Sequence, residues 1–120
     1  NWYFGWSLIL AGFATGAALG LFFHREDFLG GYASFRRRIV RLGHIALVAL
    51  GAINVLYGLS SPLLDGSAGS QAASIGFIVG GLSMPAVCFL SGWRDFFRYF
   101  FFIPVASLVV AVIGALRSGP

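Results

Sequence analysis

Residues 66–93 read GSAGSQAASIGFIVGGLSMPAVCFLSGW and form the longest stretch of the chain without a charged side chain. These 28 residues exceed the roughly 20 apolar residues that a helix needs to cross the hydrocarbon core of a membrane. Further charge-free stretches occupy residues 1–24, 42–64 and 99–116. A bilayer offers no water to the backbone, and no strand-like alternation recurs in the sequence. The four stretches therefore predict four transmembrane helices.

The composition of the chain agrees with this interpretation. Hydrophobic side chains make up 58% of the 120 residues and charged side chains only 10%, a balance too apolar for a water-soluble domain. We expect an all-α integral membrane protein that forms a single transmembrane domain over residues 1–120. Its helices are predicted at about 2–24, 38–59, 72–91 and 98–116, arranged as an up-down-up-down four-helix bundle.

Positive charge is divided unevenly between the predicted connections. Basic residues of the first and third connections, with their flanks, are Arg25, Arg36, Arg37, Arg38, Arg41, Arg94 and Arg98. The second connection, 60–71, has none, and only Arg117 lies toward the other side. Because basic residues stay on the cytoplasmic side, both termini are predicted to face the periplasm across a bacterial inner membrane. The chain begins with Asn1 rather than Met, and we expect a segment upstream to have been removed or left out.

Three consecutive arginines, Arg36, Arg37 and Arg38, stand at the predicted start of the second helix. Cations at a helix N-terminus oppose the macrodipole, at a cost of about 0.3–1 kcal/mol each, so local helix stability does not explain them. We expect these residues and Arg41 to contact anionic phospholipid or a partner subunit. The net charge of +4 does not indicate a nucleic-acid partner, because most of the chain is predicted to lie in lipid.

Small residues recur on every predicted helix. Lipid tails are as apolar as Leu, so helices in a bilayer associate through close packing of small residues and a few hydrogen bonds. The residues expected at helix contacts are Gly12, Gly16, Gly20, Gly51, Asn54, Gly58, Gly76 and Gly80. Asn54 is the strongly polar member of this set and is expected to hydrogen-bond across helices.

Phenylalanine is concentrated before the fourth predicted span. The residues concerned are Phe96, Phe97, Phe100, Phe101 and Phe102, out of 13 Phe in the chain. Such a crowded run cannot point entirely into one small bundle, so part of it is expected to face lipid or another protein.

Two histidines are candidates for cofactor ligands. His24 ends the first predicted helix and His44 lies near the start of the second, so antiparallel neighbours place both near the inner face. Two facing imidazoles can ligate the iron of haem b, and one alone can ligate the magnesium of a (bacterio)chlorophyll. The alternative, which leaves the chain without a cofactor, is that both histidines meet headgroups, water or Glu26. No metal site is predicted.

The sequence does not predict an enzyme, since it has no Ser and His constellation and no carboxylate pair at membrane depth. We expect a structural accessory subunit of a larger energy-transducing membrane complex, as in electron transport or photosynthesis, with other membrane subunits as partners. One alternative is an electron-transfer or pigment-binding protein that uses His24 and His44. Another is an oligomeric small-molecule carrier, suggested by Asn54 and by a kink predicted at Pro85.

Overall fold

The computed structural model describes residues 1–64 and 66–119, and every regular element in these residues is helical. The long helices are α1 (Trp2–Phe22), α2 (Phe35–Ser60), α3 (Ala68–Trp93) and α4 (Phe102–Ser118). Short 3₁₀ helices occupy the connections as η1 (Phe28–Gly30), η2 (Ser61–Leu63) and η3 (Asp95–Phe101). Four helices are long and apolar enough to cross a membrane, the second when α2 is joined to η2 and the fourth when α4 is joined to η3.

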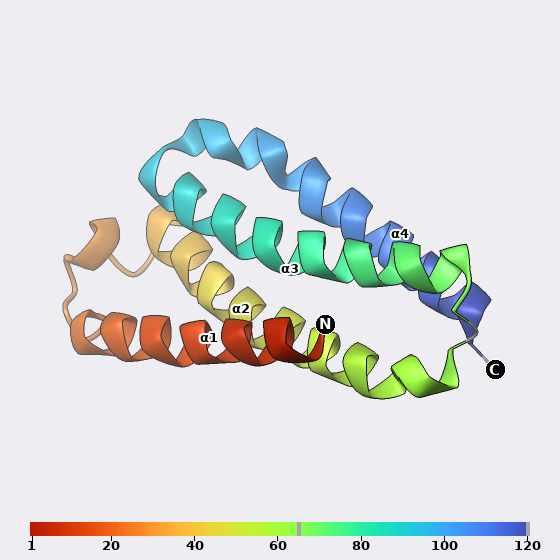
Figure 1. Ribbon diagram of the computed structural model, residues 1–120. Coiled ribbons are helices and arrows are strands. Elements are labelled where there is room, and N and C mark those ends of the chain that lie inside the picture. The colour runs from red at the N-terminus through yellow and green to blue at the C-terminus, as the bar shows by residue number, and fades with distance from the viewer. Residues whose placement is uncertain (65, 120) are drawn as a thin grey trace.

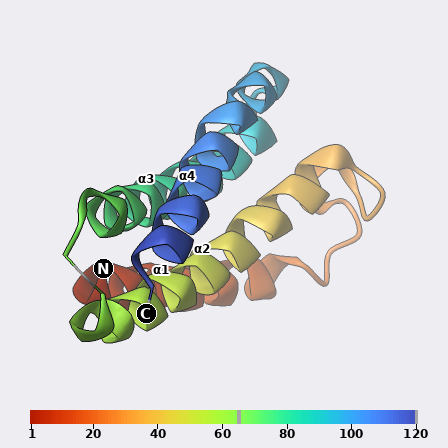
Figure 2. The same cartoon turned by 90° about the vertical axis from the view of Figure 1, so that its right-hand side faces the viewer.

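The helices run antiparallel in an up-down-up-down order, and each packs against the next along the chain (Figure 1). Helices α2 and α3 form the middle of the bundle, since each packs against two neighbours, while α1 and α4 lie at its two edges. Figure 2 shows the same helices from the side on which the C-terminus lies. The bundle is consequently flattened, with principal extents of 51 × 27 × 16 Å. The apolar spans of the two inner helices are 44% buried, compared with 17% for the two edge helices. Most of the apolar surface of α1 and α4 therefore faces outward.

The helix ends are set by caps that differ from the predicted boundaries. Helix α2 begins at Phe35 because the Ser34 hydroxyl accepts a hydrogen bond from the Arg37 backbone amide at 3.2 Å. Helix α4 begins at Phe102, later than predicted, because η3 precedes it. Pro104 consequently stands in the first turn of α4, where a missing backbone amide costs nothing.

Helix α3 runs unbroken from Ala68 to Trp93 through Pro85. Pro85 therefore does not end the helix, and the kink predicted at this position stays a prediction.

Helices α1 and α2 cross at a pair of glycines. A Cβ atom on Gly51 would lie 2.8 Å from the Gly5 carbonyl oxygen, and one on Gly5 would lie 2.6 Å from the Gly51 carbonyl oxygen. Farther along the same contact, Gly12 lies against the Val48 side chain and Gly58 against the Trp2 backbone. Any side chain at the crossing would push the two backbones apart, so glycine here sets the helix separation.

Helices α3 and α4 meet in the same way. Gly114 abuts the Gly69 carbonyl oxygen, where a Cβ would lie at 2.6 Å, and Gly76 abuts the Ser107 carbonyl oxygen at 2.7 Å. Gly80 lies under the Leu108 side chain. Close backbone approach therefore holds each edge helix to its inner neighbour.

Asn54 joins three parts of the bundle and is fully buried. Its amide nitrogen donates to the Leu50 carbonyl within α2 at 2.9 Å and to the Phe77 carbonyl of α3 at 3.0 Å. Its amide oxygen accepts from the Asn1 side chain at 2.9 Å. The amide thus links α2 to α3 and to the start of α1, and its hydrogen bonds are satisfied inside the molecule.

Candidate functional site

The arginines gather at one end of the bundle. The connection between α1 and α2 and the connection between α3 and α4 lie at this end, which we call the arginine end, and the chain termini point away from it (Figure 1). Of the eight arginines, only Arg117 belongs to the opposite end. The geometry of the guanidinium groups divides the remaining seven into structural and exposed members.

Arg37 is a structural member and is only 4% exposed. Its guanidinium donates to the Arg25 carbonyl at 2.9 Å and to the Phe23 carbonyl. The carbon of the same group lies 4.5 Å from the centre of the Phe23 ring and 4.0 Å from that of Tyr32. The last carbonyl groups of a helix have no hydrogen-bond donor within that helix. The Arg37 guanidinium donates to such carbonyls just after the end of α1, and it also stacks on two aromatic rings.

Arg36 likewise donates a hydrogen bond to the C-terminal end of a helix, in this case α3. Its Nε atom donates to the Gly92 carbonyl at 2.7 Å, in the last turn of that helix. Helix α2 is antiparallel to both α1 and α3, so its first turn lies beside the C-terminal ends of both. Cations that oppose the dipole of α2 therefore complement the dipoles of its two neighbours.

This arrangement gives an internal structural role to two of the four α2 arginines for which a contact with lipid or a partner is predicted. Arg37 is only 4% exposed and its guanidinium is bonded to two backbone carbonyls, and Arg36 has one nitrogen bonded internally. The macrodipole of α2 alone does not reveal the hydrogen bonds of these two residues, because their acceptors belong to other helices. The signal in the sequence is the short first connection, which forces the start of α2 to lie beside the end of α1.

Arg38 and Arg41 are the exposed members on α2. They are three residues apart and so lie on one face of the helix. Among the described residues neither guanidinium has a hydrogen-bond partner. Neither forms an ion pair with these residues, because the one salt bridge among them joins Arg25 to Asp27. Together with Phe23, Tyr32 and Arg37 they line a hollow of about 160 Å³, which we call the arginine hollow.

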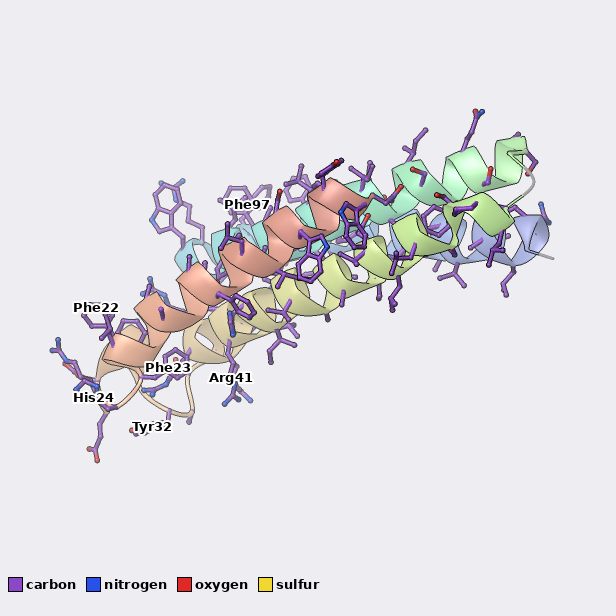
Figure 3. All side chains as sticks on the ribbon, turned by 60° about the horizontal axis from the view of Figure 1, so that its bottom comes forward. Phe22, Phe23, His24, Tyr32, Arg41 and Phe97 are labelled. Atoms are coloured by element: carbon purple, nitrogen blue, oxygen red, sulfur yellow. The ribbon has the colours of Figure 1, made fainter. Side chains whose placement is uncertain are left out.

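A second hollow adjoins the first along the α1–α2 face. It measures about 230 Å³, and its lining is Gly16, Leu19, Gly20, Phe23, Arg41 and His44. Phe23 and Arg41 line both hollows, and Figure 3 shows these two side chains next to each other at the arginine end. We call this second space the glycine groove. A Cβ atom added at Gly20 would meet no neighbouring atom within 4 Å, so this residue is an open part of the groove and not a helix contact.

The two histidines are not brought face to face. His44 lies against Gly16, and its Nδ1 atom is 3.3 Å from the Thr15 hydroxyl. His24 is exposed beyond the end of α1, about two helical turns farther along, at the tip of the structure (Figure 3). Ligation of one haem iron by both residues is therefore incompatible with this arrangement.

The phenylalanine run occupies η3 and the first residue of α4. Phe96 and Phe102 are exposed, while Phe97, Phe100 and Phe101 are half-buried. The Phe96 ring packs edge to face against Phe97 and Phe100, with 5.6 Å between the centres of Phe96 and Phe100. Within the described residues no group of three or more His, Cys, Asp or Glu side chains is placed to hold a metal ion.

A third hollow lies on the outer surface between α3 and α4 and measures about 470 Å³. Its lining combines small residues of both helices with larger aliphatic ones. The lining consists of Ala72, Ile75, Gly76, Val79, Ala106, Ser107 and Val110. We call it the α3–α4 groove.

Comparisons with protein-family models, with curated proteins and with solved structures find no match for this chain.

Proposed function

We propose that this chain is a multi-pass protein of the bacterial inner membrane that serves as a structural subunit of a larger membrane assembly. The observation that carries the proposal is the contrast between inner and edge helices. Helices α1 and α4 are long and apolar, yet only 17% of each span is buried by the rest of the molecule. Apolar surface of that extent is stable against lipid or against another membrane protein, and not against water.

The distribution of charge supports the orientation. Seven of the eight arginines belong to the arginine end. Basic residues in short connections remain in the cytoplasm during insertion. In the proposed orientation the arginine end faces the cytoplasm, and both termini face the periplasm.

The α3–α4 groove supports the role as a subunit, and we assign it to a transmembrane helix of another protein. Its small residues, Ala72, Gly76, Ala106 and Ser107, allow a partner backbone to approach closely. The polar group best suited to an internal substrate site, the Asn54 amide, is instead satisfied by bonds within the bundle. The geometry therefore favours assembly over transport.

Extraction into native nanodiscs tests this function. We expect a particle that contains one or more other proteins in fixed stoichiometry, rather than the 12.8 kDa chain alone. Ala106→Trp should fill the α3–α4 groove and release those proteins. Leu10→Trp, a matched change at a position of α1 that is 69% exposed, should retain them. A lone monomer, or loss of the partner in both variants, contradicts the proposal.

A further inference from the structure

We infer that the arginine end carries a binding site for one anionic glycerophospholipid, with the phosphate in the arginine hollow and one acyl chain in the glycine groove. The inference deepens the proposed function, because it relies on a location in the membrane. It identifies a ligand and the residues that hold it.

The position of the phosphate follows from two arginine charges that no carboxylate neutralises among the described residues. Arg38 and Arg41 present two guanidinium groups on one face of α2, and neither is neutralised by a carboxylate among the described residues. The buried Arg37 adds a third positive charge to the same hollow. Guanidinium groups form bidentate hydrogen bonds with phosphate oxygens, and basic pockets on the cytoplasmic side of membrane helices recognise anionic headgroups.

The hollow is also held in shape before any ligand arrives. Arg37 is fixed by two backbone carbonyls and lies against the rings of Phe23 and Tyr32. The Tyr32 hydroxyl in turn donates to the His24 carbonyl at 3.4 Å. Residues that are ordered in advance lose little conformational entropy when a ligand binds, so the site is preorganised.

The acyl chain position follows from the glycine groove. Gly20 leaves an open channel on α1, and Leu19 and Phe23 give it apolar walls. Because Phe23 and Arg41 line both spaces, the groove leads directly away from the arginine hollow. A charged hollow joined to an apolar groove matches an amphipathic ligand. Inorganic phosphate or another small anion would fill the hollow and leave the groove without an occupant.

Native mass spectrometry of the purified protein in detergent tests the site with phosphatidylglycerol, phosphatidylcholine and glycerol phosphate as probes. We expect one tightly bound phosphatidylglycerol, at least tenfold weaker phosphatidylcholine, and no retained glycerol phosphate. Arg38→Gln/Arg41→Gln should weaken phosphatidylglycerol binding by about thirtyfold, because each basic residue near a lipid phosphate contributes close to a factor of five. Gly20→Leu should weaken lipid binding by filling the groove, although no neighbouring atom opposes the new side chain.

The matched control is Arg94→Gln/Arg98→Gln, which removes two exposed charges from the same end but outside the hollow. It should bind phosphatidylglycerol like the parent protein. Equal loss in the two double variants, equal binding of the two lipids, or retention of glycerol phosphate would each overturn the inference. Helical content of every variant, followed by circular dichroism, confirms that folding is retained. Since the purified chain is used alone, lipid binding survives or fails independently of the partner subunit.

Discussion

Replacing Gly51 with Leu is expected to lower the free energy of unfolding by about 3 kcal/mol, because overpacking at a closed contact forces the backbone to move. The Cβ atom of the new side chain would lie 2.8 Å from the Gly5 carbonyl oxygen and 3.1 Å from the Ile9 backbone nitrogen. Neither atom belongs to a flexible side chain that can turn aside. Helix α1 must therefore separate from α2, and reversible unfolding in mixed micelles with increasing dodecyl sulfate measures the cost.

Gly20→Leu is the matched control for this variant. It makes the same substitution in α1, at a position without a neighbouring atom within 4 Å. Without added lipid, its stability should equal or slightly exceed that of the parent, since Leu favours a helix more than Gly by roughly 0.5–1 kcal/mol. Equal destabilisation by the two substitutions would mean that the crossing of α1 and α2 at Gly5 and Gly51 is not as described.

The second large effect is expected for Arg37→Met, with a loss of about 3–5 kcal/mol. The substitution keeps a long side chain but removes the charged hydrogen bonds to the Phe23 and Arg25 carbonyls, each worth about 1.5–3 kcal/mol. It also removes the cation–π contact with Tyr32, worth roughly 0.5–2 kcal/mol. Amide hydrogen exchange should accelerate chiefly in the connection between α1 and α2.

Arg38→Met provides the control, because the neighbouring side chain is exposed and has no internal hydrogen bond among the described residues. Its effect on stability in lipid-free detergent should remain within about 0.5 kcal/mol. Arg37→Lys should fall between the two, since an ammonium group keeps the charge but lacks the planar fork that bonds two carbonyls. If Arg37→Met and Arg38→Met have equal effects, the capping role of Arg37 is wrong.

The number and approximate limits of the helices can be predicted because they depend on one simple quantity, the length of each stretch without a charged residue. Charge-free runs long enough to cross a membrane mark all four helices, and residues 66–93 lie almost wholly within α3. The predicted end of the second helix agrees with the end of α2 at Ser60 to within one residue. The predicted start of the fourth helix, at residue 98, does not agree with the start of α4, because the Asp95–Phe101 segment adopts 3₁₀ geometry.

Helix packing is harder to infer from the sequence. A small residue indicates that a close contact between helices is feasible, but it does not indicate which residue of another helix lies opposite. The sequence identifies Gly51 as a packing residue but not its counterpart Gly5, since Gly5 lies outside the spacing of four that joins Gly12, Gly16 and Gly20. Gly20 shares that spacing and faces open space. Which face of a helix meets a neighbour depends on the rotation of that helix, and charge-free runs carry no information about rotation.

The arginine end shows why a site is harder to predict than a span. Arg36, Arg37 and Arg38 are the same residue type, but Arg36 bonds to α3, Arg37 bonds to carbonyls that follow α1, and Arg38 is exposed. Successive residues of a helix point about 100° apart, so neighbours in sequence have unrelated surroundings. Similarly, His24 and His44 lie at the same end of the bundle but too far apart to share a ligand.

Accessibility of single cysteines tests the central claim, that four helices cross the membrane with the arginine end in the cytoplasm. Cys88 is buried and is replaced by Ala, after which Ala33→Cys marks the arginine end and Leu63→Cys the opposite end. A membrane-impermeant maleimide added to intact spheroplasts should label Leu63→Cys, and should label Ala33→Cys only after the membrane is permeabilised. Labelling of Ala33→Cys in intact spheroplasts would contradict the account.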